Sequence, residues 1–120
     1  MPQDPAECIK NMCDAIEHRG PDSYGYWSDK ELGIHLGHRR LSIIDLSVAG
    51  NQPMQTQDGR LVIVFNGEKY NHSEIRKQLE RTSKMNWRGG SDTETLLRSI
   101  ESFGLERTLR MARGMFAFAL

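Results

Sequence analysis

The segment LVIVFNGEKYN, residues 61–71, decides the fold. It begins with five consecutive apolar residues, mostly β-branched, which predicts a short buried strand. This strand should end at Asn66, where the side-chain amide and the N–H of Gly67 are neighbouring hydrogen-bond donors and Glu68 adds a carboxylate. Two donors aimed at one oxygen form the oxyanion hole that acyl transfer needs. The alternative is a strand followed by an ordinary Asn-Gly turn, and this segment alone favours the turn.

Length and composition predict one domain with its own core. The 120 residues include 16 basic and 16 acidic ones, so the formal net charge is zero. This balance argues against nucleic acid or an anionic membrane as a partner. The two cysteines do not make a disulfide framework, and the sequence shows neither a membrane span nor the apolar core of a signal peptide. We therefore expect a cytoplasmic protein.

The remaining sequence alternates between strand and helix signals. A helix should run from Pro5 to just before Gly20, with Asp4 as its cap, and Ser91 and Asn71 should cap two later helices in capping boxes with Glu94 and Glu74. Strands are predicted at 24–28, 33–38, 41–47 and in a hairpin over 54–65, with helices from 71, over 91–104 and over 105–113. Hairpins followed by helices predict an α+β fold with antiparallel sheets packed against helices.

Two further features concern the ends of the chain. In the first helix Cys8, Ile9, Met12, Cys13 and Ile16 share one face, which predicts that both cysteines are core residues and not nucleophiles. At the other end, GMFAFAL predicts a buried strand, and an apolar terminus is uncommon. We therefore expect the chain to be a fragment of a longer protein. Its unpaired sheet edges should lead to self-association.

Six motifs occur in one order along the chain. They are HRGPD at His18, GHRRLSIIDLS at Gly37, AGNQPM at Ala49, NGEKYN at Asn66, GSDTE at Gly90 and GMFAFAL at Gly114. In that order and spacing they resemble the glutaminase domain of the glutamine-dependent asparagine synthetases, a class II glutamine amidotransferase domain. The resemblance covers nearly the whole chain and implies the N-terminal nucleophile hydrolase fold, with αββα layers, as one partial domain over residues 1–120 that is incomplete at both ends.

The resemblance implies a glutamine site. It assigns the α-carboxylate of glutamine to Arg40, which would otherwise be a solvated arginine at a strand end, as we interpret Arg39. It assigns the α-ammonium to two carboxylates, one of which is also a helix-start acid favoured by the helix dipole. His35, His38 and His72 lack metal-ligand spacing, so we predict no metal site. The residues implied for the site are Arg40, Glu68, Asp92, Asn66 and Gly67 of the oxyanion hole, and the backbone of Leu41 and Ile43.

The chain departs from the family pattern at two places. The family nucleophile is an amino-terminal cysteine, whereas this chain has Pro2 after Met1, so we expect the chain alone to be inactive. Lys69 stands where the family has isoleucine, and it should point away from Asn66 and Glu68. HRGPD is interpreted as structural.

Two functions follow from these observations. The first is the glutaminase domain of an asparagine synthase, which would bind glutamine and release ammonia for asparagine synthesis in the full protein. The second is a binding module that holds glutamine or a partner without hydrolysing it. The resemblance implies no cofactor in this domain, because ATP and Mg²⁺ belong to a synthetase domain that is absent from this chain.

Overall fold

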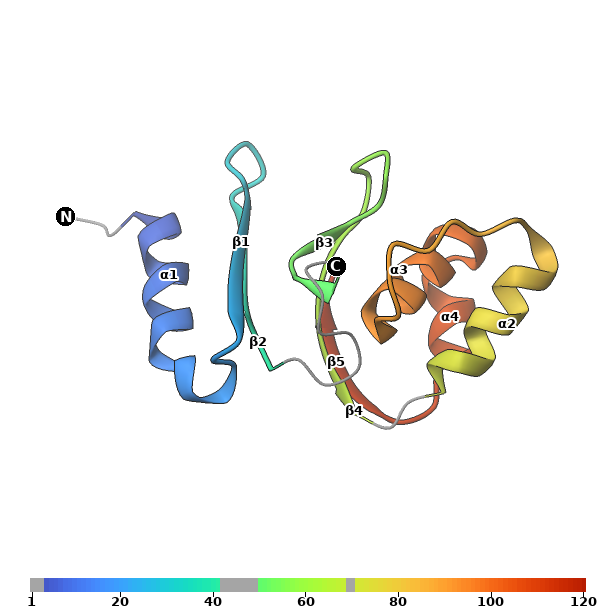
Figure 1. Ribbon diagram of the computed structural model, residues 1–120. Helices are drawn as coiled ribbons and strands as arrows, with labels where there is room; N and C mark the ends of the chain where they lie inside the picture. Colours follow the sequence, from blue (N-terminus) through green and yellow to red (C-terminus); the bar gives the residue numbers. More distant parts are fainter. Residues whose placement is uncertain (1–3, 42–49, 69–70) are drawn as a thin grey trace.

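The computed structural model describes residues 4–41, 50–68 and 71–120. Figure 1 shows four layers in the order α1, the β1–β2 hairpin, the β3–β4–β5 sheet, and the helices α2, α3 and α4. The predicted α+β class and αββα layering are confirmed. The elements are α1 (Pro5–Ala15), the 3-10 turn η1 (Glu17–Arg19), β1 (Ser23–Asp29), β2 (Ile34–Arg40), β3 (Met54–Gln55), β4 (Val62–Glu68), α2 (His72–Thr82), α3 (Asp92–Phe103), α4 (Leu105–Met111) and β5 (Met115–Ala119).

α1 packs against the outer face of the hairpin. A Cβ at Gly37 of β2 would lie 2.6 Å from the Sγ of Cys13 and 2.9 Å from Cγ1 of Ile9, so a glycine permits the close approach. Cys13 is buried, but Met12 and Ile16 are 64% and 45% exposed. The prediction of one buried helix face is therefore wrong for Met12 and Ile16, because a two-stranded hairpin covers only a narrow stripe of a helix.

The start of α1 follows its sequence signals more closely than its end. Oδ1 of Asp4 accepts a hydrogen bond from the Ala6 N–H at 3.2 Å, so the predicted cap is confirmed. The α-helix ends at Ala15, and η1 continues the chain to Arg19, so the predicted helix was too long.

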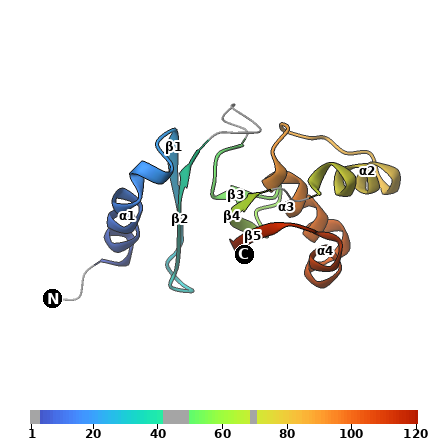
Figure 2. The ribbon, with the colours of Figure 1, turned by 90° about the horizontal axis from the view of Figure 1, so that it is seen from below.

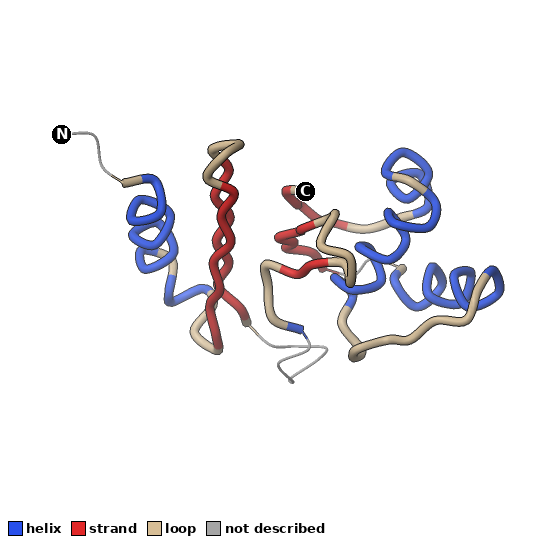
Figure 3. The backbone as a smooth tube through the Cα atoms, turned by 90° about the horizontal axis from the view of Figure 1, so that it is seen from above, coloured by secondary structure: helices blue, strands red, loops and turns tan. Residues whose placement is uncertain are grey.

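The core lies between the central sheet and the helices α2 and α3. β4 is the middle strand, and its apolar run is buried as predicted, with Ile63 at 0% and Phe65 at 4% exposure. Figure 3 shows the helices on the outer sides of the two sheets. The core residues are Met54, Ile63, Phe65, Ile75, Leu79, Leu96, Leu97 and Ile100.

β5 lies at the edge of the central sheet. It pairs antiparallel with β4 from Val64↔Ala119 to Glu68↔Met115. Phe116 and Phe118 pack against the core, whereas Met115 is 76% exposed. The prediction of a strand is confirmed, but the prediction that it is buried is wrong, because an edge strand with one covered face exposes alternate residues.

Two further findings complete the fold. The predicted strand over 41–47 lies mostly outside the described residues. Of the helices in the described part of the chain, none combines the length and the apolar character that crossing a membrane requires.

Candidate functional site

Arg40 ends β2 and is largely enclosed. Only 8% of the residue is exposed, and its Nη1 donates to Oδ1 of Asn51 at 2.7 Å. The Arg40 carbonyl accepts from the Asp22 N–H at 2.9 Å, so the HRGPD segment holds the end of the strand. Arg40 is therefore a buried cation at a fixed position and not a solvated arginine.

Arg39 has a different environment on the outer face of the hairpin. Its side chain is 7% exposed and lies 3.5 Å from the carboxylate of Glu17. Its Nε donates to the Gly20 carbonyl at 3.1 Å, and its guanidinium stacks on the ring of Tyr24 at 5.3 Å. The interpretation of Arg39 as solvated is wrong, because these contacts fasten η1 and the HRGPD segment to the hairpin. The interpretation of HRGPD as structural agrees with this packing.

One edge of β4 is open beyond the end of β3, within the described part of the chain. Two side chains form hydrogen bonds to the backbone of Phe65 at this edge. The Phe65 N–H donates to Oε1 of Gln52 at 2.5 Å, and the Phe65 carbonyl accepts from Nε2 of His38 at 3.2 Å. Because the backbone groups of alternate residues point to the same edge of a strand, the Gly67 N–H is directed to this edge too. The Gly67 N–H, the backbone donor predicted for an oxyanion hole, therefore points to the edge of β4 at which the pairing with β3 has ended.

Asn66 and Gly67 occupy opposite faces of the end of β4. A Cβ at Gly67 would overlap the ring of Phe65 and lie 2.9 Å from Cβ of Phe116, so packing requires glycine there. Asn66 is exposed and pairs with Ala117 of β5. The strand thus continues through Asn66-Gly67 to Glu68, so the predicted end of the strand at Asn66 and the alternative of an Asn-Gly turn are both wrong.

Asp92 begins α3, and Gln52 ties this helix start to β4. Nε2 of Gln52 donates to Oγ1 of Thr93 at 3.0 Å, and Thr93 is 3% exposed. Asp92 is half-buried, and its negative charge raises the pKa of His72, although burial is the larger effect and leaves that pKa below its usual value. The first turn of α3, which begins with Asp92, is therefore tied to the open edge of β4 through Gln52.

His38 is a half-buried histidine on the inner face of the hairpin. Burial lowers the pKa of His38; the hydrogen bond to the Phe65 carbonyl opposes this effect, and the charge of Arg40 adds to it. The imidazole is therefore neutral near pH 7, with its proton on Nε2, where it donates to Phe65. Its Nδ1 is buried and has no hydrogen-bond partner among the described residues.

Some of the predicted site residues are described by the structure, and others are not. The segment Asn51-Gln52 contacts Arg40 directly, and it contacts Phe65 and Thr93, which are the neighbours of Asn66 and Asp92. Leu41 is described and is 56% exposed. Ile43 and Lys69 lie outside the described residues, as does the side chain of Glu68, whose backbone pairs with Met115.

The sequence interpretation missed Asn51, Gln52 and His38. The AGNQPM motif contributes to the family resemblance, but no residue in it is predicted to have a role in the site. The available signal was weak: an amide pair before a proline is typical of an exposed loop, whereas Gln52 is 8% exposed and uses both ends of its amide.

Neither cysteine reaches this site. Cys8 and Cys13 both lie in α1, and Figure 2 shows the hairpin between α1 and β4. Burial raises the pKa of the Cys13 thiol, which disfavours the thiolate needed for nucleophilic attack. Among the described residues, no three His, Cys, Asp or Glu side chains are grouped so that they could hold a metal ion.

Glu94 supports the loop that precedes α3. Its carboxylate is fully buried and accepts from the N–H groups of Arg88 at 2.8 Å and Gly89 at 3.0 Å. Ser91 caps the helix as predicted, since its Oγ accepts from the Glu94 N–H at 3.0 Å. The reciprocal half of the capping box is wrong, because the Glu94 side chain satisfies the loop instead.

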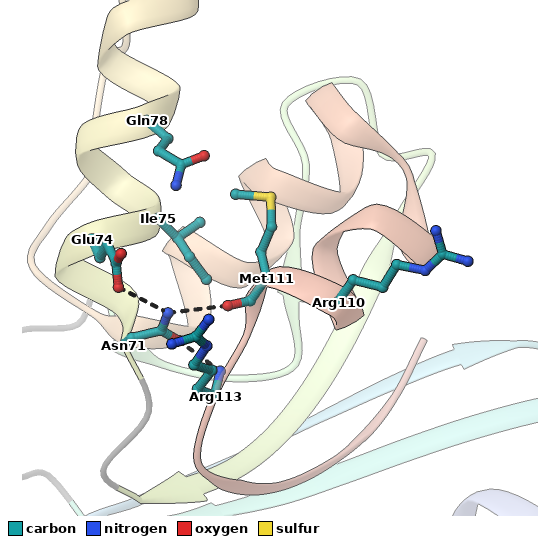
Figure 4. A pocket seen from close by; sticks show the side chains of 7 residues that line it. All are labelled: Asn71, Glu74, Ile75, Gln78, Arg110, Met111 and Arg113. Carbon is teal, nitrogen blue, oxygen red and sulfur yellow. Dashed lines mark hydrogen bonds between the residues drawn. The ribbon is translucent and has the colours of Figure 1, made fainter.

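A separate pocket lies between α2 and the chain that leads into β5 (Figure 4). Nδ2 of Asn71 donates to Glu74 at 3.2 Å and to the Met111 carbonyl at 3.0 Å, and Oδ1 of Asn71 accepts from the Arg113 N–H at 2.6 Å. Asn71 therefore joins two segments and does not cap α2 with its side chain, so the predicted cap is wrong. The pocket contains none of the predicted site residues; it is lined by Asn71, Glu74, Ile75, Gln78, Arg110, Met111 and Arg113.

Comparison with known proteins gives one consistent result. Residues 1–120 match a family model described as a glutamine amidotransferase domain. The glutamine-hydrolyzing asparagine synthetase 1 of Bacillus subtilis (strain 168) is 44% identical over 117 residues, which are 98% of this chain and 18% of that protein. The amidase chyE of Penicillium rubens is 42% identical over 112 residues, 93% of this chain and 16% of that protein. The glutamine-hydrolyzing asparagine synthetase 1 of Arabidopsis thaliana is 37% identical over 105 residues, 88% of this chain and 17% of that protein. The chain thus spans less than a fifth of the length of these relatives.

Proposed function

Because the chain belongs to the glutamine amidotransferase domain family, we propose that it binds glutamine at the end of β4 and, in the full-length protein, supplies ammonia for asparagine synthesis. The observation that carries the proposal is the arrangement around Asn51-Gln52. The side chains of this segment contact a buried arginine, the open strand edge at Phe65, two residues before Gly67, and the helix turn that begins with Asp92. These groups complement the three polar parts of glutamine.

Each part of glutamine then has a partner of the right chemistry. The guanidinium of Arg40 suits the α-carboxylate, since its planar fork matches two oxygens. Asp92 and Glu68 would hold the α-ammonium, while the backbone of Leu41 and Ile43 would line the pocket. The Asn66 amide and the Gly67 N–H would bind the side-chain oxygen and stabilise its negative charge in the tetrahedral intermediate.

The nucleophile is the part that the described residues do not supply. Both cysteines lie in α1, on the far side of the hairpin from the open edge of β4. By family resemblance, a cysteine would attack the amide carbon and release ammonia, and water would then hydrolyse the acyl-enzyme. We therefore propose that these 120 residues bind glutamine without hydrolysing it.

The proposal for the full-length protein rests on its relatives. Two of them are named glutamine-hydrolyzing asparagine synthetases, which favours the amidotransferase over a module that only binds. ATP and Mg²⁺ would act in a synthetase domain outside this chain, and the glutamine domain itself would need no cofactor. A cytoplasmic location is part of the same proposal.

Titration of the chain with glutamine tests the proposal. We expect the native chain to bind, and Arg40→Lys, Glu68→Gln and Asp92→Asn to bind about tenfold to a hundredfold more weakly, since each loses a charge-assisted contact. The exposed Arg60→Lys and Asp14→Asn are matched controls that should bind like the native chain. 4-Aminobutanamide, which lacks the α-carboxylate, should not bind. Absence of glutamine binding, or equal binding by the native chain and the three site variants, would refute the proposal.

A further inference from the structure

The side chains of Asn51 and Gln52 contact three parts of the candidate site, although the proposed function assigns no role to either residue. They reach the end of β2, the open edge of β4 and the first turn of α3. Three of the contacted residues are Arg40 of the proposed glutamine site and Phe65 and Thr93, the immediate neighbours of Asn66 and Asp92. The inference that follows deepens the proposed function and rests on it.

Gln52 continues the pairing of β4 with a side chain in place of a strand. The β3–β4 register pairs Met54 with Ile63, so two residues further it would place Gln52 opposite Phe65. There the side-chain carbonyl of Gln52, and not its backbone carbonyl, accepts the Phe65 N–H. This contact fixes the Val64–Phe65 peptide, one residue before Asn66 of the predicted oxyanion hole.

The other end of the Gln52 amide fixes the acidic side of the site. Nε2 donates to Oγ1 of Thr93, the residue directly after Asp92. Gln52 is 8% exposed and Thr93 is 3% exposed, so water competes little for this hydrogen bond. A single side chain therefore sets the position of the oxyanion hole relative to the ammonium-binding carboxylate.

Asn51 contacts Arg40, the residue proposed to bind the α-carboxylate of glutamine. Its Oδ1 accepts from Nη1 of Arg40 at 2.7 Å and from Oγ of Ser23 at 3.0 Å, which orients the guanidinium at the end of β2. The hairpin also packs closely against this segment, because a Cβ at Gly25 would overlap the Gln52 carbonyl oxygen. The segment is thus clamped between the two sheets.

We infer that Asn51 and Gln52 are the positioning residues of the glutamine site. Asn51 sets the arginine that binds the α-carboxylate, and Gln52 sets both the oxyanion donors and the helix that carries Asp92. Neither residue needs to touch glutamine. The inference predicts that their loss changes which part of the ligand is recognised.

The test compares glutamine with norleucine, an amino acid without the side-chain amide, in binding to the intact chain. Gln52→Met should weaken glutamine binding about tenfold, the effect of about 1.4 kcal/mol, and norleucine binding by less, so that the preference for glutamine falls. Thr93→Val, which removes the contact of Gln52 to α3 and the 3.5 Å hydrogen bond from Oγ1 of Thr93 to Oδ1 of Asp92, should weaken both ligands by a similar factor. Asn51→Ala should do the same through Arg40.

Controls separate positioning from general damage. Gln57→Met makes the same chemical change at an exposed turn position and should leave both affinities unchanged. The amide resonance of Gly67 should shift on addition of glutamine in the native chain and much less in Gln52→Met. If circular dichroism shows that Gln52→Met does not fold, Thr93→Val takes its place, and unchanged affinity of Thr93→Val for both ligands would then overturn the inference.

The outcomes distinguish this inference from the proposed function. If the native chain binds glutamine and a folded Gln52→Met keeps its affinity and its preference for glutamine, the inference is wrong and the proposed function stands. The same holds if every variant, including Gln57→Met, loses both ligands to the same extent. If the native chain does not bind glutamine, the proposed function is refuted and the inference with it.

Discussion

Replacing Glu94 by glutamine should destabilise the protein strongly, although the change is small in volume. The carboxylate is fully buried and accepts two backbone hydrogen bonds, from Arg88 to Oε2 and from Gly89 to Oε1. The Arg88 side chain adds a cation, with Nε 3.8 Å from Oε2. Glutamine offers one acceptor oxygen, so its NH₂ group would face one of the two N–H donors. One hydrogen bond is lost and two buried donors are left opposed.

The expected loss follows from these contacts. Hydrogen bonds to a charged group contribute roughly 1.5–3 kcal/mol, so Glu94→Gln should lower the free energy of unfolding by about 2 kcal/mol. With an unfolding entropy of about 2.1 cal/mol/K per residue, a chain of 120 residues loses about 4 °C in Tm per kcal/mol. The expected shift in Tm is therefore about 8 °C.

Thermal unfolding followed by circular dichroism at pH 7 measures this shift. Glu101→Gln is the matched control, because Glu101 lies on the same helix and makes only a partly exposed ion pair with Arg98, at 3.6 Å. A pair of that kind contributes about 0–1 kcal/mol, so the control should melt within a few degrees of the native chain. Equal melting temperatures for the two variants would refute the assignment of Glu94 as the anchor of this loop.

Two further predictions follow from the described contacts. Burial lowers the pKa of His38, so the unfolded chain binds the proton first as pH falls; His38 should therefore contribute full stability above about pH 6.5 and lose it as pH drops from there to its folded pKa. His38→Gln, which keeps a donor for the Phe65 carbonyl, should be less sensitive over that interval in urea unfolding, and an unchanged pH dependence would contradict the assignment. The edge strand β5 should drive self-association through residues such as the 76% exposed Met115, so Met115→Lys should reduce the sedimentation coefficient at high concentration; a native chain that sediments as a monomer would contradict this.

The parts of the fold that were predicted correctly depend on local signals. The apolar run before Asn66 needed no partner to be recognised as a buried strand, and Asp4 and Ser91 cap their own helices because the donors lie two or three residues away. The exposure of Met12 could not be predicted in this way. It depends on the width of the hairpin that α1 meets, and the helix sequence carries no information about that width.

The polar side chains of Asn71 and Glu94 show a second limit. Both stand where a capping box predicts a contact within the first helical turn, yet both bind segments outside their helix. A capping contact competes with any buried N–H or carbonyl group that the folded chain brings near, and a buried group without a partner is costly. The sequence did not predict the role of Gln52 for the same reason, because its partners Phe65 and Thr93 are distant in sequence and leave no local signal. The roles of Arg40 and Asp92 remain predictions.

The use of side chains at the edge of β4 explains why a ligand site can exist there. A backbone strand opposite Phe65 would continue the ladder to Gly67, because its next hydrogen-bonded pair falls two residues further along. The Gly67 N–H would then be consumed by the sheet. Gln52 and His38 satisfy both polar atoms of Phe65 and carry no backbone beyond that point, so the pairing ends one step before the glycine. The buried strand thus keeps its polar groups satisfied up to Phe65 and directs its next donor to the proposed ligand site, and the amide that ends the ladder is the one that also fixes the helix carrying Asp92.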